Sequence, residues 1–257
     1  MSGSAYLHIM KKAAEKATPN LIRDFGELER LQNSRKSLDN FVELSRKKAQ
    51  ERIVKELTGA RPDFLVVCDA ADHLVNPNEP EQFTWLVKSI SGVTNFARGI
   101  PYFATAIALM QGPDLIAGIT FDHLKSDCFK AEHGSGAFIS NRNRLRVSGN
   151  EAITGAIVAL HTSPSISTML IEMGAQPRTT GSLALDLAYL ASGKYDCIIA
   201  HAASFLDIAS GIVLIRESGG LLNYSRNNAG EAVCDIVAAA APVLMRSVSE
   251  ALSAAHA

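Results

Sequence analysis

Cysteine and histidine, two side-chain types that bind metals or act in catalysis, occur singly along this sequence. The cysteines are Cys68, Cys128, Cys197 and Cys234, and the histidines are His8, His73, His123, His133, His161, His201 and His256. No two cysteines are spaced C-x-x-C, and no histidines follow the H-E-x-x-H or H-x-H spacings that a zinc site would use. The cysteines are therefore predicted to be buried free thiols, and no zinc site is predicted.

The sequence gives little support for known motifs of catalytic nucleophiles or phosphate-binding loops. Ser45–Lys48 matches S-x-x-K, but this pattern is so permissive that a solvated helix face is the better interpretation. Neither G-x-x-x-x-G-K-[ST] nor G-x-S-x-G occurs, so Gly134–Gly136 and Gly219-Gly220 are predicted to form turns. A solvated surface is also favoured for three basic runs that could touch RNA, because acids are interspersed with them. These runs are Arg35-Lys36, Arg46–Lys48 and Arg142–Arg146.

The first half of the chain is predicted to contain two long helices followed by strands. Apolar residues recur at helical spacing over residues 5–31, where Thr18-Pro19 should kink the helix or split it into a pair. The same spacing continues over residues 40–57, with Gly59 as the expected end. From Phe64 short apolar runs replace this pattern, with a hairpin turn at Gly112–Asp114. An antiparallel meander that ends with Arg144–Ser148 is therefore predicted.

In the second half, predicted strands alternate with predicted helices. The strands cover residues 156–160, 197–200 and 235–240, and the helices cover 165–173, 182–192, 205–218 and a last segment from Pro242. Such alternation is typical of a layered α/β structure. We expect an α+β half over residues 1–149 and an α/β half over 150–257, joined in one compact unit.

The bulk composition describes an ordinary globular chain. It has 257 residues, of which 47% are hydrophobic and 20% charged, and its formal net charge of −1 gives no general attraction to nucleic acid or anionic membrane. Residues 1–16 lack the apolar core of a secretory signal. The longest apolar run, Ile236–Met245, is about half of what a bilayer span requires. A cytoplasmic protein with no membrane association is expected.

Residues 85–96 read W-L-V-K-S-I-S-G-V-T-N-F. This stretch resembles the W-[IV]-[IV]-D-P-[IL]-D-G-T-T-N-F signature of the inositol monophosphatase family. The positions that agree are Trp85, Ile90, Gly92, Thr94, Asn95 and Phe96. Lys88 and Ser91 stand where the family has two metal-binding aspartates, and Val93 stands where it has a catalytic threonine. Six positions of the signature are therefore kept, whereas its two aspartates are replaced.

Further blocks follow in the order of the family. Gly134–Phe138 and Arg144–Ser148 are similar to G-x-G-A-F and R-L-x-V-S, Gly181–Asp196 is similar to G-S-A-A-L…A-x-G-x-x-D, and Asp207–Gly220 resembles W-D-x-A-A-G…E-A-G-G. The whole set looks most like the bacterial SuhB-type branch. The resemblance implies a layered αβαβα sandwich and a homodimer, and by analogy a partner in the transcription machinery such as RNA polymerase.

The resemblance also implies roles for single residues. In the family, two or three Mg²⁺ ions clamp the substrate phosphate and activate a water molecule, held by a glutamate, the two signature aspartates and the aspartate of W-D. Asp207 keeps the last of these ligands, and Asp69, or failing that Asp72, falls at the glutamate. Arg46 replaces an aspartate that orients the attacking water. Ala200 replaces a glutamate that contacts inositol hydroxyls, so the family's substrate choice is not implied.

Lys88 should prevent metal binding. Two unit charges about 4 Å apart interact by about 4 kcal/mol at an effective dielectric of about 20, so exchanging an aspartate for a lysine beside a divalent ion changes the energy by roughly 10 kcal/mol or more. A millimolar site is worth only about 4 kcal/mol. No metal cofactor is therefore expected, and Asp69 and Asp207 are at most residual metal ligands. Mg²⁺ would be the cofactor only if hydrolysis has survived.

Fixed side-chain cations could take over the electrostatic role of the metals. Relative to the family, the formal charge at positions 46, 88 and 91 rises by five units in all, and two Mg²⁺ ions carry four. The cations are expected to pair with Asp207 and Asp69. Lys88, Arg46 and the backbone amides around Gly92 and Val93, at an expected helix start, could form a phosphate pocket.

Three interpretations stay open. The first is a catalytically impaired pseudophosphatase that binds a phosphorylated small molecule or a protein partner. The second is a working Mg²⁺-dependent phosphomonoesterase for inositol 1-phosphate or a similar sugar phosphate, with Asp69, Asp72 and Asp207 as displaced ligands. The third is structural, with Lys88 and Arg46 in salt bridges to the leftover acids and no ligand at all.

Overall fold

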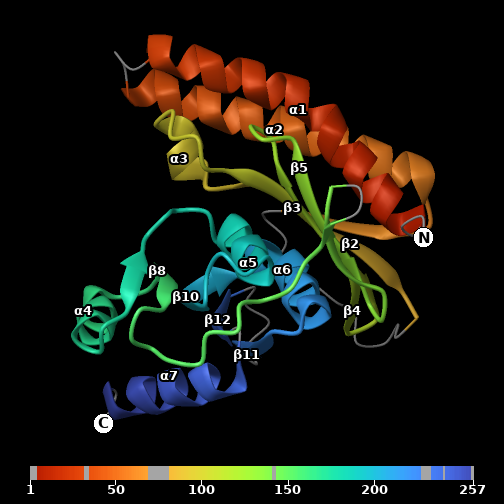
Figure 1. Ribbon diagram of the computed structural model, residues 1–257. Coiled ribbons are helices and arrows are strands. Elements are labelled where there is room, and N and C mark those ends of the chain that lie inside the picture. Colours follow the sequence, from red (N-terminus) through yellow and green to blue (C-terminus); the bar gives the residue numbers. More distant parts are fainter. Residues whose placement is uncertain are drawn as a thin grey trace.

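The computed structural model describes residues 5–31, 35–68, 81–140, 143–226, 233–239 and 241–255. Its elements lie in five layers (Figure 1). Helices α1 (Ala5–Leu31) and α2 (Arg35–Ala60) cover one face of a first sheet. Helices α5 (Leu183–Ala191) and α6 (Phe205–Ser218) lie between that sheet and a second one, whose outer face is covered by α4 (Pro164–Glu172) and α7 (Pro242–Ala255). The predicted αβαβα sandwich is confirmed.

The first sheet has seven strands in chain order. They are β1 (Leu65–Cys68), β2 (Phe83–Ser91), β3 (Ala104–Gln111), β4 (Asp114–Asp122), β5 (Asp127–Glu132), β6 (Gly136–Ile139) and β7 (Asn143–Arg144). From β2 onward neighbouring strands are antiparallel, as predicted, whereas β1 pairs parallel with β2. The strand predicted over Arg144–Ser148 is wrong. Its pairing ends at Arg144, and the amide of Val147 donates to the carbonyl of Ser218 at 3.3 Å, beside the end of α6.

The second sheet has the strand order β11-β12-β10-β8-β9. Its strands are β8 (Ile157–His161), β9 (Gln176–Arg178), β10 (Cys197–Ser204), β11 (Leu221–Arg226) and β12 (Val233–Ala239). Because β8 and β10 are parallel, their carboxyl ends lie at the same edge, where His161 pairs in register with Ala200. The sequence pattern missed β9 and β11, since β9 is only three residues long and β11 has no continuous apolar run longer than two residues.

Helix α1 runs through Pro19 as one element, so of the two expected alternatives, a kinked helix or a helix pair, the pair is wrong. A proline inside a helix removes one amide donor and tends to bend the helix. Here the hydroxyl of Thr18 bonds to the carbonyl of Ala14 at 3.1 Å and lies 2.9 Å from Nδ1 of His123. Buried apolar side chains before and after the proline hold the helix on the sheet. These are Leu7, Met10, Ala14, Ala17, Leu21 and Leu28.

Two glycines allow α6 to approach its neighbours closely. A Cβ at Gly118 on β4 would lie 2.8 Å from Cα of Ser210, and a Cβ at Gly211 would lie 2.5 Å from Cβ of Leu187 on α5. Real Cβ atoms do not come so close, so any larger residue would push the layers apart. These contacts fix α6, which carries Asp207 in its first turn.

The cysteines whose side chains are described are free thiols. Cys128 and Cys197 are buried, and burial raises the pKa of each thiol to about 12, whereas Cys68 is half-buried. The side chain of Cys234 lies outside the described residues. Within the described ranges, no helix combines the length and the apolar character that crossing a bilayer requires.

Candidate functional site

The end of strand β2 turns sharply toward a cavity. The pairing of β2 with β3 shifts register between Lys88 and Ser91, which bends the strand there. Gly92 follows with a φ of 93°, in the left-handed region, and a Cβ on it would lie 3.0 Å from the carbonyl oxygen of Tyr102. The chain then enters the short helix α3 (Val93–Ala97), as expected for a helix start at this point. Glycine is required at position 92 by both the backbone conformation and the space.

Lys88 and Asp207 form an ion pair across the cavity between β2 and α6. Nζ of Lys88 lies 3.2 Å from Oδ2 of Asp207, and each side chain is 19% exposed. The pairing expected for Asp207 is therefore present. The first turn of α6 is favourable for the carboxylate, since a helix N-terminus carries partial positive charge. With both charges matched and half-buried, separating them would expose each one to a poorly solvated environment.

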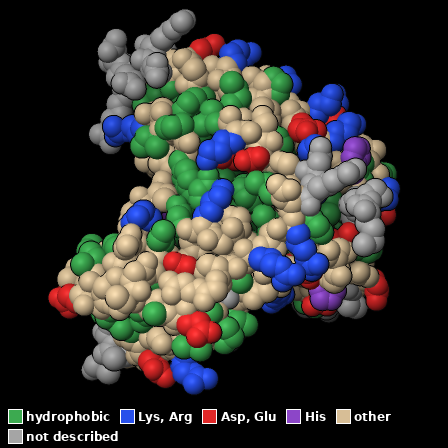
Figure 2. All heavy atoms as spheres, viewed as in Figure 1, with side chains coloured by type: hydrophobic (Ala, Val, Ile, Leu, Met, Phe, Trp, Pro, Cys, Tyr) green, Lys and Arg blue, Asp and Glu red, His purple; other side chains and the backbone are tan. Residues whose placement is uncertain are grey.

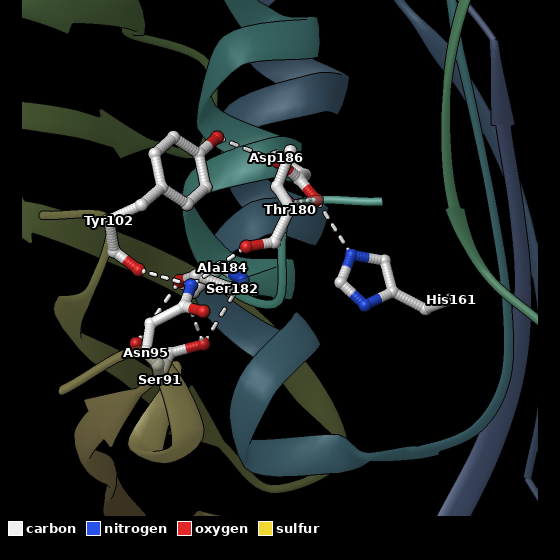
Figure 3. Close-up of polar contacts among 8 residues, drawn as sticks. All are labelled: Ser91, Asn95, Tyr102, His161, Thr180, Ser182, Ala184 and Asp186. Carbon is white, nitrogen blue, oxygen red and sulfur yellow. Dashed lines mark hydrogen bonds and ion pairs between the residues drawn. The ribbon is translucent and has the colours of Figure 1, made fainter. Parts of the chain in front are cut away.

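Ser91 is tied into the start of α5. Its side chain is 1% exposed, and its Oγ accepts a hydrogen bond from the amide of Ala184 at 3.3 Å. The hydroxyl of Ser182 also donates to the carbonyl of Ser91 at 3.1 Å (Figure 3). The family pattern has a metal ligand at position 91. Here Oγ of Ser91 instead accepts a hydrogen bond from an amide in the first turn of α5.

Asn95 joins two loops on the same side of the cavity. Its Nδ2 donates to the carbonyl oxygens of Tyr102 at 2.8 Å and Thr180 at 2.7 Å (Figure 3). Gly181 has a φ of 88°, and a Cβ on it would lie 2.9 Å from Oδ1 of Asn95. The signature asparagine therefore fixes the loop before α5 against α3.

The cavity has a volume of about 330 Å³. Its described lining comes from the end of β2 and α3, the ends of β8 and β10, the start of α6 and the loop before α5. The lining residues that carry polar or ionisable side chains are Lys88, Ser91, Thr94, His161, His201, Ser204 and Asp207. Gly92 and Val93 also line it, so five of the predicted site residues meet at one place.

Arg46 lies elsewhere. Its guanidinium holds the carboxylate of Glu43, one turn earlier on α2, through two hydrogen bonds of 2.9 Å and 2.8 Å. These hydrogen bonds lower the pKa of Glu43, with a smaller contribution from Lys47. No residue of α2 is among the described lining of the cavity. The structure therefore places the predicted phosphate ligand Arg46 in an ion pair on its own helix.

The described side chains do not fit a divalent cation. Asp69 and Asp72, the other expected carboxylates, lie outside the described residues. Among the residues that are described, no three His, Cys, Asp or Glu side chains are grouped to hold a metal ion. Asp207 is neutralised by Lys88 at 3.2 Å, and Ser91 caps a helix. Mg²⁺ requires several oxygen ligands around one point, which this donor set does not offer.

A polar network beside the cavity was not predicted from the sequence. Asp186 is completely buried on α5 and accepts hydrogen bonds from Tyr102 Oη at 2.7 Å, Thr180 Oγ1 at 2.5 Å and His161 Nε2 at 2.6 Å (Figure 3). Burial, and then the charge of Asp186, raise the pKa of Tyr102, so its hydroxyl stays a donor. One signal was available, because Asp186 is the only charged residue in the apolar helix L-A-L-D-L-A-Y-L-A.

Strand β10 contributes a second histidine. Ala200, at the position of a substrate-contacting glutamate in the family, is fully buried in the core and does not line the cavity. The strand is irregular between Ala200 and Ala203, and Ala202 has a φ of 53°. His201 lines the cavity, and its Nδ1 lies 3.3 Å from Oδ1 of Asp235. This irregular segment brings an imidazole, in place of a carboxylate, to the site.

Comparison with known proteins places these features in a family. The model of the inositol monophosphatase family matches residues 4–256. A Mesorhizobium japonicum protein named inositol-1-monophosphatase is 36% identical over 87% of this chain and 86% of its own length. A Xylella fastidiosa protein named Nus factor SuhB is 30% identical over 92% of this chain and 84% of its own length.

The solved structures agree with the sequence comparison. The crystal structure of extragenic suppressor protein suhB from Bartonella henselae superposes with a TM-score of 0.82 at 30% identity. It covers 97% of this chain and 99% of that chain. With the signature frame, the layered sandwich and these matches over nearly its whole length, the chain belongs to the inositol monophosphatase family.

Proposed function

We propose that this protein is a catalytically impaired member of its family, which binds a phosphorylated ligand without Mg²⁺-dependent hydrolysis. The observation that carries the proposal is the ion pair of 3.2 Å between Lys88 and Asp207. A cation held beside Asp207 opposes a divalent ion there by several kcal/mol at the effective dielectric of a protein site. The same ammonium group attracts a phosphate, as do the backbone amides of the first turn of α3, which border the cavity.

Phosphate release separates binding from turnover. The wild type and a Lys88→Glu, Asp207→Asn variant are incubated with inositol 1-phosphate, with and without Mg²⁺. We expect release by the wild type to stay at the level of the variant in both conditions. We also expect calorimetry to detect inositol 1-phosphate binding to the wild type in EDTA. A Mg²⁺-dependent rate clearly above that of the variant would refute the proposal.

The second candidate function is an active Mg²⁺-dependent phosphomonoesterase for inositol 1-phosphate or a similar sugar phosphate. The name of the Mesorhizobium japonicum relative, at 36% identity, favours it. Asp69, Asp72 and Asp207 would be the metal ligands, and Lys88 would have to leave Asp207. The same assay decides between the two functions, because only this one requires release that depends on Mg²⁺.

Partners are proposed by analogy alone. Relatives named Nus factor SuhB suggest a protein of the transcription machinery, such as RNA polymerase, as an interaction partner. The family resemblance also suggests a homodimer. Light scattering after gel filtration tests the dimer, and co-purification with RNA polymerase at physiological salt tests the partner. A monomer at micromolar concentration would contradict the proposed dimer. Absence of co-purification would contradict RNA polymerase as a partner.

A further inference from the structure

His161 and Asp186 form a pair that the family signature does not contain. Asp186 has no exposed surface, and a buried carboxylate is tolerated only when its oxygens accept hydrogen bonds. Three donors from three segments supply them: Tyr102 after α3, Thr180 before α5, and His161 at the end of β8. The ring of His161 is therefore held by an acceptor that donors from two further segments also bind.

This arrangement fixes the proton on His161. A carboxylate can only accept, so Nε2 of His161, 2.6 Å from Oδ2 of Asp186, must be the nitrogen that carries hydrogen. The other ring nitrogen, Nδ1, lies on the far side of the ring from Asp186 (Figure 3). It has no hydrogen bond to any residue that the structure describes, and the side chain is 20% exposed. Nδ1 is thus available to a ligand.

The side chain of His161 lines the candidate site. His161 lines the same cavity of about 330 Å³ as Lys88 and Asp207, and it reaches the cavity from β8 while Lys88 reaches it from β2. The negative charge of Asp207 is matched by Lys88 at 3.2 Å, which reduces its repulsion of an anion. Asp186 lies on the opposite side of the imidazole from Nδ1 and accepts the hydrogen of Nε2 at 2.6 Å. The cavity is therefore lined by an ammonium group and an imidazole ring from two elements.

We propose that His161 is a phosphate-contacting residue of this cavity, whose Nδ1 hydrogen-bonds to a bound phosphomonoester through the proton that a monoanionic phosphate group carries, with Asp186 as its positioning residue. The inference rests on the proposed function and extends it, because it names a ligand contact outside the signature loop. Hydrogen bonds to charged groups contribute about 1.5–3 kcal/mol, and about 1.4 kcal/mol corresponds to a tenfold change in affinity. Removing the contact should therefore weaken phosphomonoester binding about tenfold or more.

Two amide substitutions separate this role from a structural one. In His161→Gln the side-chain amide can still donate to Asp186, but the hydrogen-bonding atom at Nδ1 is lost. In His161→Asn a hydrogen-bonding atom remains near Nδ1 and the contact with Asp186 is lost. Affinities for inositol 1-phosphate and for inorganic phosphate are measured by calorimetry in EDTA. The control is His8→Gln, at an exposed position on α1.

We expect His161→Gln to bind inositol 1-phosphate about tenfold or more weakly than the wild type, while His8→Gln binds equally well. Equal affinities of His161→Gln and the wild type would overturn the role of His161 and leave the proposed function standing. No binding by the wild type would overturn both. Weakening confined to His161→Asn would assign His161 to the support of Asp186 only, and so would also overturn the proposal.

Imidazole ¹⁵N NMR tests the wild type directly, should a variant fail to fold. Phosphate should shift the Nδ1 resonance of His161 toward the protonated form and leave His8 unchanged. Asp186→Asn should abolish the preference for a proton on Nε2, which a role confined to packing would not do. A Nδ1 resonance that does not respond to saturating phosphate would refute the contact.

Discussion

At Ser91 the side-chain oxygen accepts the amide of Ala184, in the first turn of α5, and lies beside the hydroxyl of Ser182. Six residues before it on the strand, Trp85 is completely buried and anchors β2 in the core. The family's ligand position is thus occupied by a group whose hydrogen bonds stabilise a helix start. The contribution of this hydrogen bond to stability can be measured without any ligand or metal.

Ser91→Ala should lower the free energy of unfolding by about 1 kcal/mol, because it removes a capping acceptor and leaves a buried amide without its partner. Ala184 is fully buried, so water cannot replace the lost hydrogen bond. Urea unfolding followed by circular dichroism measures the change. Ser165→Ala, at an exposed position on α4, is the control and should stay within about 0.5 kcal/mol of the wild type. Equal effects of the two substitutions would contradict the capping role.

At the scale of elements, acids neutralise the basic run of α2. Arg46 binds Glu43, and Lys47 lies 3.6 Å from the same carboxylate. Lys47 and Lys48 are exposed, which supports a solvated helix face there, whereas the side chain of Arg46 is only 20% exposed. Positive and negative side chains are also interspersed on the face of the molecule that Figure 2 shows. The side chains of Arg35 and Lys36, and residue Arg142, lie outside the described residues, so those runs stay predictions.

The close approach of α6 to α5 predicts opposite effects for two helical glycines. Gly211→Ala would place a Cβ 2.5 Å from Leu187 and should destabilise the fold by about 1–3 kcal/mol. Gly26→Ala, in α1 where nothing lies within 4 Å, should leave stability unchanged or raise it by up to about 1 kcal/mol. Thermal and urea unfolding of both variants test this pair. Destabilisation of equal size in both would show that the layer contact does not decide the effect.

His123 connects α1 to the first sheet and makes stability depend on pH. Its ring contacts Thr18 and Thr105 at 2.9 Å and 2.8 Å, and burial lowers its pKa from 6.5 to about 3. Between these values the unfolded chain binds a proton that the folded chain does not. The contribution to stability is therefore full above about pH 6.5 and falls by about 1.4 kcal/mol per pH unit below it.

Urea unfolding at pH 7, 6 and 5 measures this effect. His123→Gln should be less stable than the wild type at pH 7, and the difference should shrink as pH falls, since glutamine does not titrate. His8→Gln, on the exposed side of α1, should keep the slope of the wild type. Parallel stability profiles for His123→Gln and the wild type would exclude His123 as the titrating group.

For the whole molecule, sequence patterns predicted elements better than contacts. The helix over residues 205–218 was predicted with the bounds that α6 has, and the turn at Gly134–Gly136 is present, with both amides donating to Glu217. The order of the layers came from the family resemblance, because periodicity does not say which face of a sheet a helix covers. The pair of His161 and Asp186 could not be predicted, since 25 residues and two elements separate them.

The family scaffold should regain a metal site when its ligands return. The variant Arg46→Asp, Lys88→Asp, Ser91→Asp, Val93→Thr restores the carboxylates and the hydroxyl of the signature pattern. Without an ion, the carboxylate at position 91 would be nearly buried with no matching charge, because the wild-type side chain is 1% exposed. We therefore expect the variant to be less stable than the wild type in EDTA and to be stabilised by Mg²⁺ or Mn²⁺. At a concentration 100 times the Kd, the gain would be about 2.7 kcal/mol.

Unfolding in EDTA and in millimolar Mg²⁺ or Mn²⁺ measures this coupling, with calorimetry for the affinity. The matched control, Arg46→Asn, Lys88→Asn, Ser91→Asn, Val93→Thr, has similar shapes without the charges and should not respond to either ion. The wild type should not respond either, since the ammonium of Lys88 lies 3.2 Å from Asp207. A wild type stabilised as much as the restored variant would show that Lys88 does not exclude the ion. A restored variant without response would show that the scaffold around the ligands has also changed.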